Sequence, residues 1–335
     1  MDSPSNFYPR LSIVELNKLV HWKYNVLDLS ITNIVLVPFW NFLLNYIPGF
    51  ISPNLLTLCG LVVSLSVWAI TEYLFVSIPL IITLYFISST LDGLDGKLAR
   101  KIDNSTPFGE LFDHSVDIIT LFVVTRITMI IFGAGEIELT PVYIVVGYAF
   151  CYSHYIAYIR GYVTLERFSG PNEMLLVVIL SYVTNSYCNF AVYLPLDIIH
   201  LFAVYFSVVI FLAMCYKIDE ESKEYYRIDL PISRLTGFFV MISIFSLQLD
   251  ISAIQIVCMF VIINAELITT KMADTNFRHN VILCCAVCLI GKWVAIATTI
   301  YVMVSILGQI KHHLQIPFLA VFNYYDYLVA NRKIY

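Results

Sequence analysis

The sequence predicts an all-α polytopic membrane protein with about ten transmembrane helices and an N-terminal interfacial amphipathic helix. Two observations support this fold class. The 335 residues are 59% hydrophobic and only 13% charged, whereas soluble domains carry about 25% charged residues. Apolar runs long enough to cross a bilayer also recur along most of the chain, and the mean hydropathy is +0.81. The composition therefore excludes an ordinary soluble domain.

The amino-terminal region is expected to lie outside the hydrocarbon layer. Residues 1–27 are mostly polar and hold no early apolar core, so we expect a cytosolic arm without a cleavable signal peptide. Residues 28–48 are apolar but are interrupted by polar residues and by Pro38. We interpret them as a helix that lies in the membrane interface, where Trp40 and Tyr46 suit the headgroup level.

The rest of the chain consists mainly of apolar segments. The candidate spans are residues 54–71, 73–91, 114–133, 141–159, 174–192, 195–215, 235–249, 251–270, 280–306 and 314–330. Arg126 and Lys292 lie inside two of these spans, and a buried cation needs a partner or a wet cavity. Glu266 is a candidate partner for one of them.

Basic residues predict the orientation of these spans. With a cytosolic amino terminus, the loops that hold most of the Lys and Arg residues are also cytosolic. They lie at residues 92–112, 160–173, 216–234 and 271–279. The opposite loops carry almost no basic residue. We therefore expect the face that carries residues 92–112 to be cytosolic.

One acidic stretch stands out within this apolar chain. It reads DGLDGKLARKIDNSTPFGELFDHSVD and carries two pairs of aspartates, Asp92 with Asp95 and Asp113 with Asp117. Spacings of three and four residues place both members of a pair on one face of a helix. Four converging acids in a membrane protein need positive charge to balance them. Two Mg²⁺ or Mn²⁺ ions are the simplest partners, and such a site suits phosphoryl transfer. The alternative is an acidic, solvated loop at the membrane surface.

This stretch resembles the signature of the CDP-alcohol phosphotransferase family, D-x2-D-G-x2-A-R-x8-G-x3-D-x3-D. The resemblance implies that Asp92, Asp95, Asp113 and Asp117 hold two metal ions, with Asp92 and Asp113 touching both. The residues expected to bind the CDP-linked substrate are Asn54, Gly96, Ala99, Arg100 and Gly109.

Chemical reasons accompany these assignments. Gly96 and Ala99 keep one helix face small enough for a nucleotide to lie against it. Arg100 offers a planar fork of donors to a phosphate. Gly109 allows the second helix to start close to the first. Asn54 belongs to the segment PNLLTLCGL, which resembles a family segment whose Asn approaches the cytidine.

Two residues are candidates for the base that activates the attacking hydroxyl. Asp117 is the usual suggestion for the family, but a carboxylate bound to metal is a weak base. His114 follows Asp113 directly, and imidazole is suited to proton transfer near neutral pH. We favour His114. The stretch around Glu173 resembles a family segment with an acidic residue at this position, which implies that Glu173 orients His114. The alternative for Glu173 is a purely structural role as an acidic residue at a helix N-terminus, where it interacts favourably with the helix dipole.

Further segments resemble the eukaryotic choline/ethanolamine phosphotransferase branch of the family. They are GELFDH at residues 109–114, FSGPNE at residues 168–173 and YNVLDLS at residues 24–30. The resemblance implies transfer of phosphocholine or phosphoethanolamine from CDP-choline or CDP-ethanolamine to diacylglycerol, with release of CMP. The rivals are a CDP-diacylglycerol-dependent transferase with an inositol or glycerophosphate acceptor, and a non-enzymatic transporter that uses the acids as an ion path.

The chain is accordingly divided into three regions. Residues 1–48 form the cytosolic arm and interfacial helix, residues 49–215 the catalytic helices, and residues 216–335 further transmembrane helices. The resemblance implies a multi-pass enzyme of the endoplasmic reticulum or Golgi membrane, with its active site facing the cytosol. It also implies a homodimer, and no nucleic acid partner is expected.

Overall fold

The structure is a computed structural model. It describes residues 11–28, 30–73, 77–131, 136–165, 171–188, 251–275, 277–278 and 280–316. The expected spans at residues 195–215 and 235–249, and all but the first three residues of the span at 314–330, lie outside these ranges.

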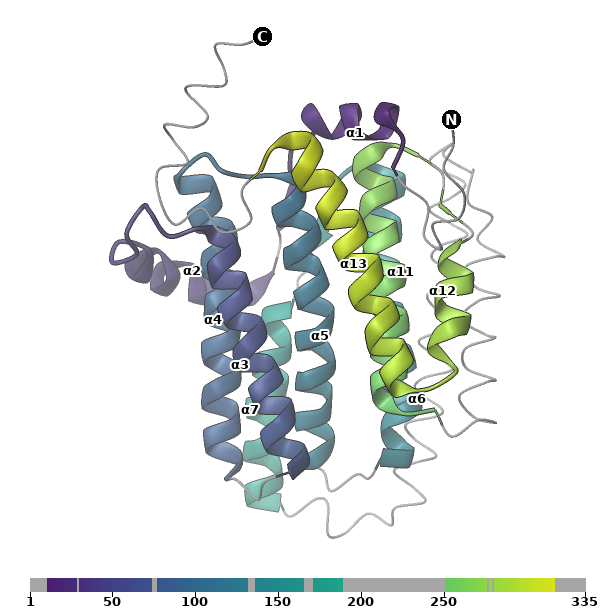
Figure 1. The fold of residues 1–335 in the computed structure, drawn as a ribbon. Coiled ribbons are helices and arrows are strands. Elements are labelled where there is room, and N and C mark those ends of the chain that lie inside the picture. The colour runs from purple at the N-terminus through teal and green to yellow at the C-terminus, as the bar shows by residue number, and fades with distance from the viewer. Residues whose placement is uncertain are drawn as a thin grey trace.

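The described residues form a bundle of long helices with two short strands (Figure 1). The helices are α1 (Ile13–Val20), α2 (Ile31–Leu44), α3 (Pro53–Tyr73), α4 (Ile78–Lys101), α5 (Pro107–Ile131), α6 (Glu136–Arg160), α7 (Pro171–Cys188), α11 (Ala253–Ala273), α12 (Asn280–Cys288) and α13 (Lys292–Leu314). Within these ranges, five helices are long and apolar enough to cross a membrane: α3, α4, α5, α11 and α13. The all-α membrane fold is thus confirmed, while the total of ten spans stays a prediction.

Helix α11 forms the centre of the bundle. It packs against α5, α6, α12 and α13, and nearly all of its residues are buried. The contact with α6 is close, because a Cβ atom on Gly147 would lie 2.5 Å from the Phe260 ring. A mostly apolar helix whose few polar side chains find partners is suited to such a central position. This position also brings α11 beside the acidic half of α5.

Small polar residues hold α3, α4 and α5 together. The hydroxyls of Ser64 and Ser88 lie 2.7 Å apart, and Ser88 also donates to the carbonyl oxygen of Gly60 at 3.0 Å. Ser64 lies 3.1 Å from the hydroxyl of Thr120. Small residues allow close helix approach, and their hydroxyls bridge helices where no water is available. These contacts fix α4 beside α5, the two helices that carry the aspartates.

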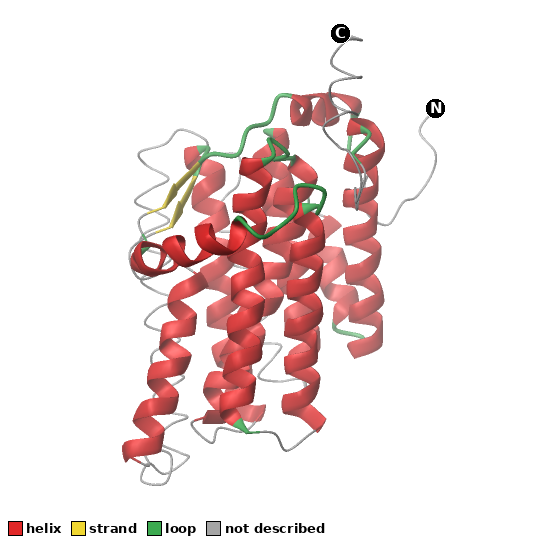
Figure 2. Ribbon diagram, turned by 90° about the vertical axis from the view of Figure 1, so that its left-hand side faces the viewer, coloured by secondary structure: helices red, strands yellow, loops and turns green. Residues whose placement is uncertain are grey.

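Helix α2 lies crosswise to the bundle and packs on α4 (Figure 2). Its outer residues Ile34 and Phe42 are exposed, whereas Trp40 is buried. The Trp40 indole lies directly over Gly93, where a Cβ atom would approach it to 2.5 Å. Lys101 donates to the carbonyl oxygen of Leu44 at 2.9 Å. A crosswise helix with an exposed apolar face agrees with the predicted interfacial helix.

Replacing Gly93 with alanine is expected to separate α2 from α4. The new methyl group would collide with the rigid Trp40 indole, and overpacking of this kind costs about 1–3 kcal/mol. We expect a lower thermal unfolding temperature of the purified protein in detergent. Gly60→Ala is the matched control, because its nearest neighbours would lie at 3.6 Å or more. Equal unfolding temperatures for both variants would show that the Trp40 contact does not matter.

Two short strands, which the sequence did not predict, pair in parallel. They are β1 (Val26–Asp28) and β2 (Val163–Leu165), with Val26 opposite Val163. The pair fastens one end of the amino-terminal arm to the end of α6 (Figure 2). The other end is fastened by α1, where Lys18 donates to the carbonyl oxygen of Asp274 at 2.8 Å. The described part of the arm is therefore folded onto the bundle.

Two expected boundaries were wrong. Residues 92–112 were expected to form a loop, but α4 continues to Lys101 and α5 begins at Pro107. Buried Leu94 and Leu98 continue the apolar packing of α4 beyond the first aspartate. The expected span 280–306 is broken between α12 and α13, with Gly291 at the amino-terminal cap of α13.

This break also relocates Lys292. It stands exposed at the start of α13 rather than in the middle of a span. Glu266 pairs instead with Arg278, whose Nε lies 3.3 Å from its Oε1. Arg278 also donates its backbone N–H to the same oxygen at 3.0 Å.

Candidate active site

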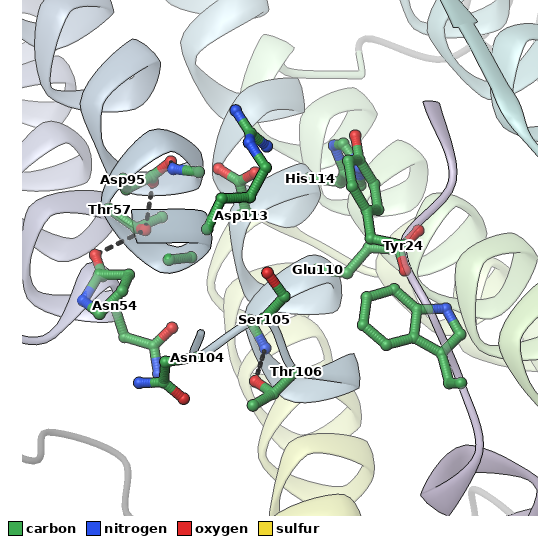
Figure 3. A pocket seen from close by; sticks show the side chains of 16 residues that line it. Tyr24, Asn54, Thr57, Asp95, Asn104, Ser105, Thr106, Glu110, Asp113 and His114 are labelled. Carbon is green, nitrogen blue, oxygen red and sulfur yellow. Dashed lines mark hydrogen bonds between the residues drawn. The ribbon is translucent and has the colours of Figure 1, made fainter. Parts of the chain in front are cut away.

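A cleft lies at the end of the bundle where α4 ends and α5 begins (Figure 3). The amino-terminal arm and the start of α3 complete its walls. The predicted site residues that line it are Asn54, Asp95, Gly96, Ala99, Arg100, Gly109, Asp113 and His114. Residues from three helices, far apart in the sequence, therefore meet in one cavity.

The four aspartates form two overlapping groups beside this cleft. Ligand atoms of Asp92, Asp95 and Asp113 lie within 4.8 Å of one another, and so do those of Asp113, His114 and Asp117. Asp113 belongs to both groups, and Asp92 also contacts Asp117. Helical spacing explains the arrangement, since each pair lies on one face of α4 or α5.

This donor set fits divalent metal ions. Carboxylate oxygens are the ligands that Mg²⁺ and Mn²⁺ prefer. Oδ1 of Asp113 is buried and makes no hydrogen bond within the described part of the chain. An unpartnered carboxylate oxygen at the point where the two groups overlap is chemically satisfied by a cation. The two groups can thus hold metal ions, and the assignment of two Mg²⁺ ions stays a prediction.

Asp95 is held by a residue that the sequence reasoning missed. Thr57 on α3 donates its hydroxyl to Oδ2 of Asp95, while the backbone N–H of Gly96 donates to Oδ1. Thr57 is part of the PNLLTLCGL segment that drew attention to Asn54. Its position one helical turn after Asn54 was the available signal.

His114 is oriented by Asp117. Its Nδ1 lies 2.9 Å from Oδ2 of Asp117, one turn further along α5. The Nε2 atom is buried and makes no hydrogen bond to any described residue. The His154 ring lies beside it, with centroids 4.8 Å apart. Asn264 of α11 donates to the carbonyl oxygen of His114 at 3.0 Å.

The proposed partner of His114, Glu173, is the third residue of α7. Its side chain lies outside the part that the structure describes, as do residues 168–170 of the FSGPNE segment. Orientation of His114 by Glu173 therefore stays a prediction, whereas Asp117 already provides one carboxylate for this purpose.

The small residues around the cleft have distinct neighbours. A Cβ atom on Gly109 would lie 3.3 Å from Oγ1 of Thr106 and 3.5 Å from Oδ1 of Asn54. Gly109 thus allows α5 to start close to Asn54. A Cβ atom on Gly96 would meet only the Arg100 guanidinium, at 3.5 Å. Arg100 therefore lies over the small face of α4.

Comparison with known proteins now identifies the family. A sequence model of the CDP-alcohol phosphatidyltransferases matches residues 50–218, which is half of the chain. The chain belongs to the CDP-alcohol phosphatidyltransferase family. The matched range contains all the aspartates and the cleft residues from α3, α4 and α5.

Similar proteins have more than one chemistry in their names. Ethanolaminephosphotransferase 1 of Homo sapiens is 31% identical over 175 residues, which cover 46% of this chain and 44% of that protein. Cholinephosphotransferase 1 of Danio rerio is 34% identical over 134 residues, 37% of this chain and 35% of that protein. A CDP-diacylglycerol–serine O-phosphatidyltransferase of Encephalitozoon cuniculi is 31% identical over 167 residues, which cover 46% of this chain and 43% of that protein. The chain thus spans less than half the length of these relatives.

The chain also carries a buried ion pair, of which one member, Glu110, lines the cleft. Glu110 of α5 contacts Lys271 of α11 through Oε1. The two side chains are only 1% and 9% exposed. The pair links the helix that bears Asp113 to the centre of the bundle. Sequence reasoning missed it because the partners lie 161 positions apart.

Proposed function

We propose that this protein transfers phosphocholine or phosphoethanolamine from the CDP-linked alcohol to the hydroxyl group of diacylglycerol, with release of CMP. The observation that carries the proposal is the convergence of four aspartates, two of which, Asp95 and Asp113, line one cleft together with Arg100. Such a site holds the charge of a diphosphate and of its divalent ions together. Similarity to an ethanolaminephosphotransferase and a cholinephosphotransferase supports the choice of donor.

The residues of the cleft suit a nucleotide donor. Gly96 and Ala99 leave room for the cytidine to lie against α4, and Asn54 at the start of α3 offers an amide to the base. Arg100 lies above the same face and can donate two parallel hydrogen bonds to a phosphate. Gly109 keeps α5 close enough to α3 for these groups to act on one ligand.

Two divalent ions bound by Asp92, Asp95, Asp113 and Asp117 would supply positive charge to the diphosphate. The diacylglycerol oxygen forms a bond to the β-phosphorus, and the bond from that phosphorus to the bridging oxygen breaks. CMP leaves with the electron pair of the broken bond. The hydroxyl proton passes to Nε2 of His114, which has no other hydrogen bond to the described residues. Asp117 holds Nδ1 and stabilises the imidazolium that forms.

A second candidate comes from the similar CDP-diacylglycerol–serine O-phosphatidyltransferase. The same carboxylates would then act on CDP-diacylglycerol, with serine as the acceptor. Inositol or glycerophosphate acceptors belong to the same class. A transporter that uses the acids as an ion path is a weaker alternative, because Arg100 lies beside the acids and would repel a passing cation.

A radiometric assay on purified protein separates these candidates. CDP-choline and CDP-ethanolamine are offered separately with diacylglycerol and Mg²⁺, and CDP-diacylglycerol is offered with serine. Metal-dependent CMP release with either CDP-alcohol supports the proposal and identifies the headgroup. Product only from CDP-diacylglycerol overturns it in favour of the second candidate. No CMP from any combination removes both reactions.

We propose that the enzyme lies in the endoplasmic reticulum or Golgi membrane as a homodimer, with the cleft facing the cytosol. The orientation rests on basic residues at the helix ends beside the cleft, namely Lys101 of α4, Arg160 of α6 and Lys271 of α11. Loops rich in such residues remain cytosolic. The cytosol also contains CDP-linked alcohols and Mg²⁺.

Asn104 tests this orientation directly. It begins the glycosylation sequon Asn104-Ser105-Thr106 and lines the cleft. We expect no glycan there, because a cytosolic sequon never meets the glycosylation machinery. The measurement is the electrophoretic mobility of the expressed protein before and after glycosidase treatment. A mobility shift that disappears in Asn104→Gln would reverse the proposed topology.

A further inference from the structure

The amino-terminal arm crosses the cleft between two anchors. On one side, two hydrogen bonds fix α1. Lys18 donates to the carbonyl oxygen of Asp274, and Nε2 of His313 lies 3.1 Å from Oδ1 of Asn17. On the other side, β1 pairs in register with β2. The chain between these anchors carries Trp22 and Tyr24, and both line the cleft. A segment held at both ends presents these rings in a defined place.

The two rings form an angled aromatic wall. Their centroids lie 6.1 Å apart, with the planes tilted by 46°. Tyr24 also lies 6.3 Å from the His114 ring, so the wall adjoins the residue proposed to receive the proton. Burial, followed by the nearby charge of Glu110, raises the pKa of Tyr24. The phenol therefore stays neutral, and its ring face remains attractive to a cation.

A carboxylate oxygen completes this corner of the cleft. Figure 3 shows Glu110 close to Tyr24, on the same side as His114. Oε1 of Glu110 is taken by Lys271, but Oε2 is buried and makes no hydrogen bond within the described part of the chain. A buried carboxylate oxygen without a partner is costly. An ammonium group would satisfy it and would also lie against the aromatic rings.

The separation of Glu110 from the proposed phosphate site matches the length of a headgroup that carries an ammonium group. Glu110 precedes Asp113 by three residues on α5, so the two side chains share one face about one helical turn apart. In choline and ethanolamine, two carbons separate the nitrogen from the oxygen that carries the phosphate. A headgroup extending from the phosphates toward Glu110 therefore brings its nitrogen between the carboxylate and the rings.

We propose that Trp22, Tyr24 and Glu110 form a headgroup pocket that selects donors with an ammonium group. The inference rests on the proposed function and adds the substrate class at this position. The rings attract the cation through their faces, and Oε2 of Glu110 accepts a hydrogen bond from a primary ammonium. Uncharged headgroups gain neither interaction. Choline uses mainly the rings, whereas ethanolamine uses mainly the carboxylate.

The test compares charged donors with an uncharged one. Wild-type protein receives CDP-choline, CDP-ethanolamine and CDP-3,3-dimethylbutanol, in which a carbon replaces the choline nitrogen. The kcat/KM is expected to be about tenfold higher for CDP-choline than for this neutral isostere. Trp22→Leu and Tyr24→Leu should each raise KM for CDP-choline and remove most of this preference. Glu110→Gln should weaken the binding of CDP-ethanolamine more than the binding of CDP-choline.

Control variants separate recognition from folding. Trp22→Phe and Tyr24→Phe retain an aromatic face and should retain the preference. Trp293→Leu removes an exposed ring at the start of α13 and should change nothing. Equal kcat/KM values for the charged and neutral donors in wild-type protein would overturn the proposed pocket. Equal losses of kcat/KM for both donors in the Leu variants would also overturn it. Absence of CMP release from every CDP-alcohol would instead overturn the proposed function, and the pocket with it.

Discussion

Replacing Asp113 with asparagine is expected to reduce CMP release by about 10³-fold or more. Asp113 belongs to both groups of candidate metal ligands, and its Oδ1 makes no hydrogen bond to a described residue. Asparagine keeps the shape of the side chain but removes the charge that would hold two cations. The loss should appear in kcat at saturating CDP-alcohol and should persist when Mg²⁺ is raised. The measurement is initial-rate CMP release at several Mg²⁺ concentrations.

Glu15→Gln is the matched control for this variant. It also replaces a carboxylate with an amide, but on α1, where the Glu15 side chain accepts the backbone N–H of Ser12 in a capping box. Glutamine can keep that hydrogen bond. Both variants should unfold at the wild-type temperature, while only Asp113→Asn loses activity. An Asp113→Asn protein with more than a tenth of wild-type kcat would remove the shared-ligand assignment.

The alignment of the aspartates within each pair could be predicted because it depends on local geometry. Spacings of three and four residues fix each pair on one helix face, whatever the rest of the fold does. The family signature then required the two faces to meet. Local spacing does not determine whether Asp92 lies in a loop or in a helix. Buried Leu94 and Leu98 extend α4 past Asp92 by packing on neighbouring elements. The expected loop at residues 92–112 was wrong for this reason.

The long-range partners of the site could not be predicted. Lys271 reaches Glu110 and Asn264 reaches the backbone of His114 because α11 lies at the centre of the bundle. The sequence of α11 does not indicate which neighbouring helices its few polar side chains will contact. The pairing of β1 with β2 is equally non-local, and it places Trp22 and Tyr24 in the cleft.

The orientation of His114 could be predicted only in part. Asp117 follows it by three residues, so a contact on one face of α5 was available from spacing alone. The sequence reasoning gave Asp117 to the metal ions and chose Glu173 for His114. The structure brings Asp117 to Nδ1 of His114, and Asp117 also belongs to a candidate metal group. A carboxylate with both contacts would couple the position of the base to the metal site.

Replacing His114 with glutamine is expected to lower kcat by about 10²–10⁴-fold, the range typical for loss of a general base. Glutamine can hydrogen-bond to Asp117 but cannot take a proton from the acceptor hydroxyl near neutral pH. The KM for the CDP-alcohol and the Mg²⁺ concentration for half-maximal rate should stay close to wild type. His312→Gln is the matched control, because this histidine lies exposed in the last turn of α13, outside the cleft.

The comparison with Asp117→Asn decides between the two candidate bases. As a metal ligand, Asp117 should change the Mg²⁺ requirement when it is replaced, whereas a base should change kcat alone. His114 would count as a ligand rather than the base if His114→Gln mainly raised the Mg²⁺ requirement and kept kcat at saturating metal. The free Nε2 beside the shared ligand Asp113 argues for the opposite result. A base in that position would receive the hydroxyl proton beside the aspartates that would hold the cations.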